Sequence, residues 1–252
     1  MRLTALFLLL AAMAYAHDGG ISIEELHDDP WAYLGMPDPV QVLAVASFLS
    51  GLAVFYSLFV KSMSEEAKTL LFGAICAPIA LATIYLGATT VYMNAVSETG
   101  GPVHWHADFE VWACGERQDL IDPTGLDNKV GSPAVHEHND GRIHIEGVLL
   151  KREEASLRNF FIQTGGNFEE GSLTIPTNGG VMTWSNGELC NGRPAKWLVF
   201  VNGELLDAEE AHDHILAPYA ITRLQGGQGD LIKIVFTEKA PATVNAELGV
   251  EP

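Results

Sequence analysis

Two long runs without charged residues most constrain what this 252-residue chain can fold into. Pro39–Val60 holds 22 residues and Thr69–Val96 holds 28. About 20 apolar residues are enough to cross a bilayer as a helix, so we predict transmembrane helices over both runs. Between them lies a short polar segment, residues 61–68, bounded by Lys61 and Lys68. Basic residues favour the cytoplasmic side, which makes this segment a predicted cytoplasmic loop.

The first 38 residues set the orientation of this hairpin. Arg2, a short apolar run and the small residues Ala14 and Ala16 have the pattern of a secretory signal peptide. We therefore predict a signal peptide over residues 1–16 and an extracytoplasmic lead-in over 17–38. Whether the signal is cleaved or kept, everything after Val96 is predicted to lie outside the cytoplasm. The expected location is the cell membrane, with an extracytoplasmic C-terminal domain.

The segment Val103–Ala113 alternates strictly between apolar and polar residues. Side chains of a β-strand alternate between its two faces, so this pattern predicts a half-buried strand. Its polar face carries His104, His106, Asp108 and Glu110. Two imidazoles on one face are about 7 Å apart at the backbone, close enough for both to reach one ion.

A second segment, Val135–Gly147, repeats this arrangement. His136 and His138 precede a further alternating run in which His144 and Glu146 share a face. If this strand pairs with Val103–Ala113, the two polar faces merge and their side chains become cross-strand neighbours. The clustering of histidines and carboxylates predicts a metal site rather than ordinary solvated polar residues.

Imidazole and carboxylate ligands suit transition metals, of which copper and zinc are the expected ions here. The strongest candidate ligands are His104, His106 and His144. The further candidates are His136, His138, Glu110 and Glu146. The pair His212 and His214 lies in a polar stretch predicted to be loop or helix, where positions i and i+2 do not share a face, so it is not included.

Three segments, HWHADFEVWACGE, VHEHNDGRIHIEG and KWLVFVNGELL, carry a family resemblance. They resemble a group of uncharacterised secreted or membrane-anchored domains of bacteria and archaea, which carry an HxH strand, a second histidine pair followed by IHxE, and a later VNG hairpin. The resemblance covers most of Val103 to Thr237. It implies a folding unit built around the histidines and no particular activity.

A weaker, partial resemblance is to the metal motifs of cupins. His104, His106 and Glu110 have the spacing of the first cupin motif, and Gly141 and His144 have part of the second. Two glycines of these motifs are missing, and Asn139 stands where the second motif has proline. This resemblance implies a metalloenzyme in a β-barrel, with Glu110 as a ligand.

Residues 97–240 are predicted to form an α+β domain that is mainly β with one main helix, and residues 241–252 a disordered tail. Cys114 and Cys190 lie in this exported domain, where a disulfide between them is favoured over two buried thiols. The helix is expected at Lys151–Gln163. Strands are expected at His144–Leu150, Gly180–Trp184, Lys196–Val201 and Leu231–Thr237.

The formal net charge of −18 suits attraction of cations and argues against a nucleic-acid partner. Three functions remain open. The first is capture, buffering or delivery of copper or zinc by a membrane-anchored protein, as a homo-oligomer or with membrane-protein partners. The second is a cupin-like metalloenzyme, and the third a structural or assembly module with incidental histidines. A filled coordination sphere favours the first, and an open site in a deep pocket favours the second.

Overall fold

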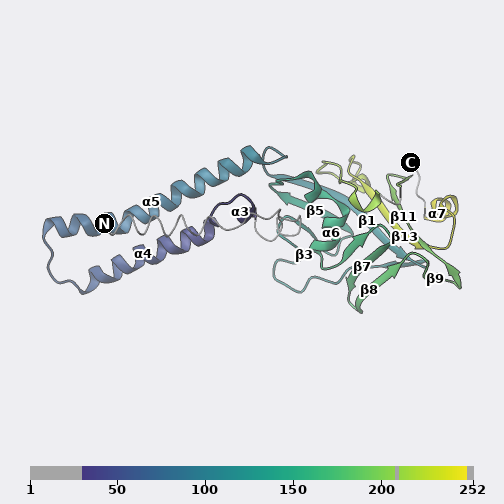
Figure 1. Ribbon diagram of the computed structural model, residues 1–252, viewed down its shortest axis with the longest axis horizontal. Helices are drawn as coiled ribbons and strands as arrows, with labels where there is room; N and C mark the ends of the chain where they lie inside the picture. Colours follow the sequence, from purple (N-terminus) through teal and green to yellow (C-terminus); the bar gives the residue numbers. More distant parts are fainter. Residues whose placement is uncertain (1–29, 208–209, 249–252) are drawn as a thin grey trace. The chain divides into compact units, whose positions relative to one another are not determined.

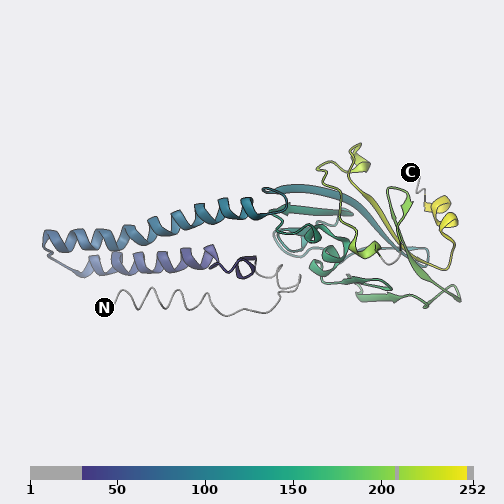
Figure 2. The ribbon, with the colours of Figure 1, turned by 45° about the horizontal axis from the view of Figure 1, so that its top comes forward.

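The computed structural model describes residues 30–207 and 210–248, so the predicted signal peptide and most of the lead-in lie outside the described residues. The chain divides into two compact units, one up to Ala95 and one from Val96. The first unit is helical, and its two long helices form an antiparallel hairpin (Figures 1 and 2). Its helices are α3 (Pro30–Tyr33), α4 (Pro39–Phe59) and α5 (Glu65–Val96).

Helices α4 and α5 are long and apolar enough to cross a membrane, with 21 and 32 residues. Large apolar side chains on both, such as Leu58, Phe59 and Leu70, are exposed, unlike those of a core helix in a soluble domain. The buried positions hold small residues instead, among them Ala82 and Ser50, whose hydroxyl donates to a carbonyl of the other helix 2.9 Å away. Small residues and such polar contacts are typical of helix packing in membranes.

The second unit is built on an eight-stranded mixed sheet with the strand order β12-β11-β13-β1-β5-β4-β3, and β2 pairs with β1. Strand β1 is central and pairs parallel with β13 and antiparallel with β5. The strands of this sheet are β1 (Val103–Ala113), β2 (Glu116–Gln118), β3 (Val130–Gly131), β4 (Val135–Glu137), β5 (Arg142–Gly147), β11 (Lys196–Val201), β12 (Glu204–Leu205) and β13 (Leu231–Thr237).

The remaining elements complete the domain. A three-stranded sheet has the order β6-β7-β8, and β9 pairs with β10. These elements are η1 (Arg152–Ala155), α6 (Leu157–Gln163), β6 (Asn167–Glu169), β7 (Ser172–Thr177), β8 (Gly180–Ser185), β9 (Leu189–Cys190), β10 (Arg193–Pro194), η2 (Ala211–Asp213), η3 (Arg223–Gln225) and α7 (Pro241–Leu248). The predicted fold class, an apolar two-helix hairpin followed by a mainly β domain with one main helix, is confirmed.

The main hydrophobic core lies on one face of the large sheet. Phe109 and Ile143, from β1 and β5, are buried there with Phe160 of α6, and the rings of Phe109 and Phe160 are 5.0 Å apart. Because side chains alternate along a strand, the even-numbered residues of β1 must occupy the opposite face. The fold thus places the histidines on the side of the sheet away from this core.

Besides shifts in the ends of α5 and β5, two segments differ from the sequence predictions. The helix expected over Lys151–Gln163 is divided into η1 and α6 at Ser156, whose extended backbone and side-chain acceptor for the Asn159 N–H make it an N-cap. The tail expected to be disordered contains helix α7 over Pro241–Leu248. Its Val244 is buried with Leu198, Phe200 and Val235, and this contact explains why the segment folds.

The disulfide between Cys114 and Cys190 is present, with 5.2 Å between the two Cα atoms. It joins the end of β1 to β9 across a sequence separation of 76 residues. The predicted pairing is therefore confirmed. The remaining cysteine, Cys76, is exposed on helix α5.

Candidate metal centre

Strand register brings histidines from three neighbouring strands side by side. His106 of β1 lies opposite His144 of β5, and His144 lies opposite His136 of β4. His104 is two residues before His106 on the same face, and His138 follows directly after β4. The five histidines therefore form one continuous cluster across β1, β5 and β4.

Within this cluster, His104, His106 and His144 form a first group, which we call the outer triad. One ring nitrogen from each lies within 4.8 Å of the others. The ring centroids of His104 and His106 are 4.6 Å apart, and those of His106 and His144 are also 4.6 Å apart. His104 is exposed, His106 is partly buried and His144 is buried.

His136, His138 and His144 form a second group, which we call the inner triad. Their ligand atoms also lie within 4.8 Å of one another. The ring of His144 is stacked on that of His136 at 5.4 Å and meets the ring of His138 edge-on at 4.7 Å. His136 and His144 are buried, and His138 is partly buried. His144 is thus shared by both triads.

Backbone carbonyls fix the tautomers of three of these rings. The Nδ1 atom of His106 lies 2.6 Å from the carbonyl oxygen of Ala220, and that of His136 lies 3.1 Å from the carbonyl oxygen of Ser132. His138 Nδ1 contacts the carbonyl oxygen of Asn128 in the same way. A carbonyl only accepts, so Nδ1 must carry the proton and Nε2 keeps its lone pair. Such partners orient metal-binding histidines in known sites.

Each triad has a carboxylate beside it. Glu146 Oε1 lies 3.4 Å from His104 Nε2, at the outer triad. Asp140 Oδ2 lies 3.4 Å from Nε2 of His144, the histidine that both triads share. Three imidazoles and a carboxylate are a donor set that binds zinc or copper in four-coordinate geometry.

Burial keeps the central rings neutral. Desolvation lowers the pKa of His144 from 6.5 to about 4, although the nearby Asp140 carboxylate opposes this shift. Desolvation also lowers the pKa of His136, against the raising effect of Glu146. Because metals bind the neutral imidazole, both rings are ready to act as ligands at neutral pH.

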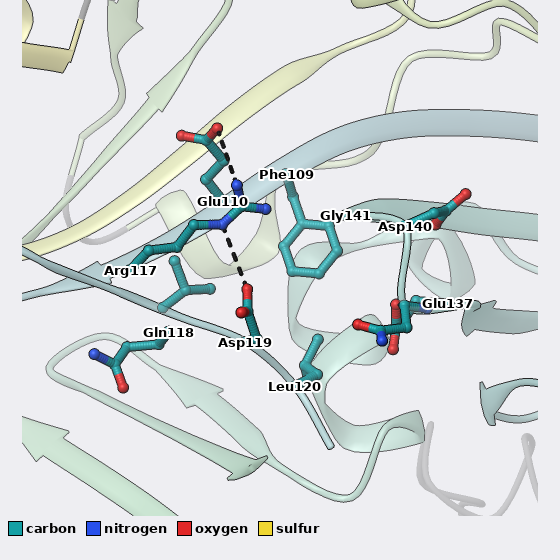
Figure 3. A pocket seen from close by; sticks show the side chains of 11 residues that line it. Phe109, Glu110, Arg117, Gln118, Asp119, Leu120, Glu137, Asp140 and Gly141 are labelled. Atoms are coloured by element: carbon teal, nitrogen blue, oxygen red, sulfur yellow. Dashed lines mark hydrogen bonds and ion pairs between the residues drawn. The ribbon is translucent and has the colours of Figure 1, made fainter. Parts of the chain in front are cut away.

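Glu110 lies apart from the triads, although its spacing made it a candidate. Its carboxylate accepts a hydrogen bond from Trp112 Nε1 at 3.0 Å and lies 3.9 Å from an Arg117 nitrogen. It lines a cavity of about 380 Å³ in which Arg117 also pairs with Asp119 (Figure 3). Glu110 therefore has a charged partner of its own, at a position where β1 pairs with Lys233 of β13.

Asp140 is a residue of the site that the sequence pattern did not predict. It lies in the turn between β4 and β5, four residues before His144, and it contacts both His144 and Arg142. The only sequence signal is its place in the Asn139-Asp140-Gly141 turn, where Asn139 and Gly141 adopt left-handed backbone conformations. Turn composition of this kind is common to many connections and does not identify a ligand by itself.

The pair His212 and His214 lies outside the cluster. His212 is buried in the short helix η2, with its ring packed 6.3 Å from that of Phe168. His214 Nε2 lies 3.0 Å from the buried carboxylate of Asp230. These two side chains thus face different partners, as expected for a pair that is not on a strand.

Comparison of the chain with models of protein families, with curated proteins and with solved structures gives no match. Functional inference therefore depends on the geometry of the histidine cluster.

Proposed function

We propose that this protein is a membrane-anchored, extracytoplasmic metal-binding protein that captures, buffers or delivers copper or zinc. The observation that carries the proposal is the pair of histidine triads sharing His144, each with ligand atoms within 4.8 Å of one another. Five convergent imidazoles, three of them with Nδ1 held by carbonyls, are difficult to explain as solvated surface residues.

The chemistry of the ligand atoms supports a divalent metal ion of intermediate hardness. Imidazole nitrogens with one carboxylate suit zinc and oxidised copper, whereas calcium and magnesium prefer all-oxygen shells. Reduced copper favours sulfur ligands, and neither triad contains a cysteine. Of these two ions, oxidised copper binds more tightly than zinc, following the general order of affinity among divalent first-row metals.

Three observations support the membrane anchor, the position outside the cytoplasm and the attraction of cations, in that order. The α4–α5 hairpin is apolar over the length that a membrane requires. The Cys114–Cys190 disulfide is the kind of bond that persists in oxidising compartments. The net charge of −18 attracts cations towards the protein surface. Association with other membrane proteins or a second copy of the chain is part of this proposal.

The test is the metal content of the full-length protein, exported, purified in detergent and offered zinc or copper. We expect about one equivalent per chain, and loss of most of it when His104, His106, His136 and His138 are all changed to alanine. His214→Ala, which removes a histidine that contacts Asp230 and lies outside the cluster, is the matched control and should keep the metal. A folded wild-type protein that takes up neither metal would refute the proposed function.

A metalloenzyme is the second candidate, favoured by the cavity of about 380 Å³ that reaches Asp140 beside His144. Glu137 also lines this cavity, and burial raises the pKa of its carboxyl group, as in many acid–base residues. A catalytic metal keeps an open coordination position. Cobalt-loaded protein whose absorption spectrum changes on adding azide would favour the enzyme, and an unchanged spectrum would favour a closed binding site.

A further inference from the structure

We propose that the two triads are successive stations for one metal ion, which enters at the outer triad and moves to the inner triad while His144 stays bound to it. This inference rests on the proposed function and adds a route to it. It explains why the chain carries five histidines in two groups where three or four ligands suffice for one site.

His144 lies midway between the other histidines of the outer triad and those of the inner triad. Its ring centroid is 4.6 Å from that of His106 on one side and 4.7 Å from that of His138 on the other. An ion held by His144 can therefore exchange its ligands one at a time, giving up those of the first triad for those of the second. It does not return to water during the transfer, which avoids the large cost of rehydrating and stripping the ion again.

Exposure gives the route its direction. The side chain of His104 is 62% exposed, so a hydrated ion can meet it directly. His136, on the opposite side of His144 within the five-histidine cluster, is 2% exposed. His104 Nε2 lies 2.9 Å from His106 Nε2, which keeps its lone pair because Nδ1 of the His106 ring holds the proton. His104 therefore donates to His106, and an incoming ion replaces that proton as the link between the two rings.

Charge favours one ion at a time. Two ions held at once would require His144 to bridge them through both nitrogens, and this needs an imidazolate anion. His144 is buried, and its Nε2 already lies 3.4 Å from the Asp140 carboxylate. Two divalent cations held on either side of one ring also repel each other strongly. A single ion that alternates between the triads avoids this arrangement.

The experiment compares loading rate with final affinity in the full-length protein in detergent. Zinc uptake is followed by stopped-flow competition with a chromophoric chelator, and affinity is measured by titration. For His104→Ala plus His106→Ala, we expect loading at least about tenfold slower and a final affinity within about threefold of wild type. For His136→Ala plus His138→Ala, we expect near wild-type loading and an affinity at least about tenfold lower.

Several results would overturn the two-station route. One is two equivalents of zinc per wild-type chain, both lost in His144→Ala, because this stoichiometry indicates a bridged pair. Another is an outer-triad variant that loads at the wild-type rate, or loses as much affinity as the inner-triad variant. The corresponding glutamine variants, which keep side-chain volume, replace any alanine variant that fails to form the disulfide. A wild-type protein that binds no metal refutes the proposed function itself, whereas the other outcomes refute only the route.

Discussion

The pairs His104/His106 and His212/His214 have the same spacing but different surroundings. The first pair lies on strand β1, where residues two apart share a face, and its Nε2 atoms are 2.9 Å apart. The second pair lies at helix η2, and its rings contact Phe168 and Asp230 instead of each other. The comparison teaches that an HxH pattern predicts shared ligation only when its backbone is extended and a neighbouring strand supplies a third ligand.

Removing the shared histidine should have the largest effect on metal binding. His144→Ala takes a ligand from both triads, and structural zinc sites bind with about 10–16 kcal/mol distributed over about four ligands. We therefore expect zinc affinity to fall by at least about 100-fold in a competition titration. His214→Ala removes a histidine of the second pair and should leave the affinity unchanged. Equal losses in the two variants would contradict the contrast between the pairs.

The second pair should instead matter for stability. Asp230 is buried and accepts hydrogen bonds from His214, Asn202 and the Ala217 N–H. Breaking a buried network of this kind costs about 3 kcal/mol, so Asp230→Asn should lower the free energy of unfolding by about that amount without changing zinc affinity. Urea unfolding followed by tryptophan fluorescence gives the first quantity. Loss of zinc affinity in a folded Asp230→Asn protein would show that the two regions are coupled.

The same carboxylate predicts an acid dependence. Burial alone raises the pKa of Asp230, but the hydrogen bonds from His214, Ala217 and Asn202 outweigh burial and lower the pKa below its ordinary value. The unfolded chain then binds this proton more readily than the folded chain. The stabilisation is complete above the ordinary pKa of about 3.9 and is lost as pH falls through the folded value. The Asp230→Asn variant should show a flatter stability profile in this range.

His144 predicts a second pH dependence, in the metal-free protein. Its folded pKa of about 4 is below the ordinary value of 6.5, chiefly because of burial. The unfolded chain therefore binds more protons between these two values, and stability rises with pH across this window and is lost as pH falls through it. The contribution is at most about 3 kcal/mol. His144→Gln should remove this slope, and an unchanged slope would show that another group causes it.

The smallest expected effect separates two carboxylates that the sequence treats alike. Glu146 lies 3.4 Å from His104 Nε2, whereas Glu110 contacts Trp112 and Arg117. Glu146→Gln removes the charge beside the outer triad and should weaken initial zinc capture by about three- to tenfold at low salt. Glu110→Gln is the matched control with no expected change. If Glu110→Gln has the larger effect, the assignment of the two carboxylates is wrong.

Much of the fold could be predicted from local sequence patterns. The alternation in Val103–Ala113 and the apolar runs Lys196–Val201 and Leu231–Thr237 correspond to β1, β11 and β13. The uncharged runs correspond to the hairpin helices, although α5 begins at Glu65, earlier than expected, because acidic residues are favourable in a first helical turn. Helix α7 was missed because its sequence shows little sign of a helix. The buried contact of Val244 that explains why it folds is visible only in the structure.

Long-range pairing could not be read from the sequence. Alternation places His106 and His144 on polar faces, but only the antiparallel register of β1 and β5 puts them opposite each other. A shift of one residue in the register of β5 against β1 would have turned the histidines of one strand towards the core face. The carbonyls of Ala220 and Asn128 come from loops whose paths follow no sequence rule. Asp140 is near His144 because of the geometry of the turn between β4 and β5, which the sequence does not specify either.

The most direct test of the central claim is the position of the metal itself. Crystals of the zinc-loaded full-length protein would be measured at wavelengths above and below the zinc absorption edge. We predict one anomalous difference peak bound to His144, about 2.0–2.1 Å from the ligating nitrogens, with the remaining histidine ligands from the inner triad. A loaded protein whose peak lies at His214 and Asp230, or anywhere away from the five-histidine cluster, would contradict the account.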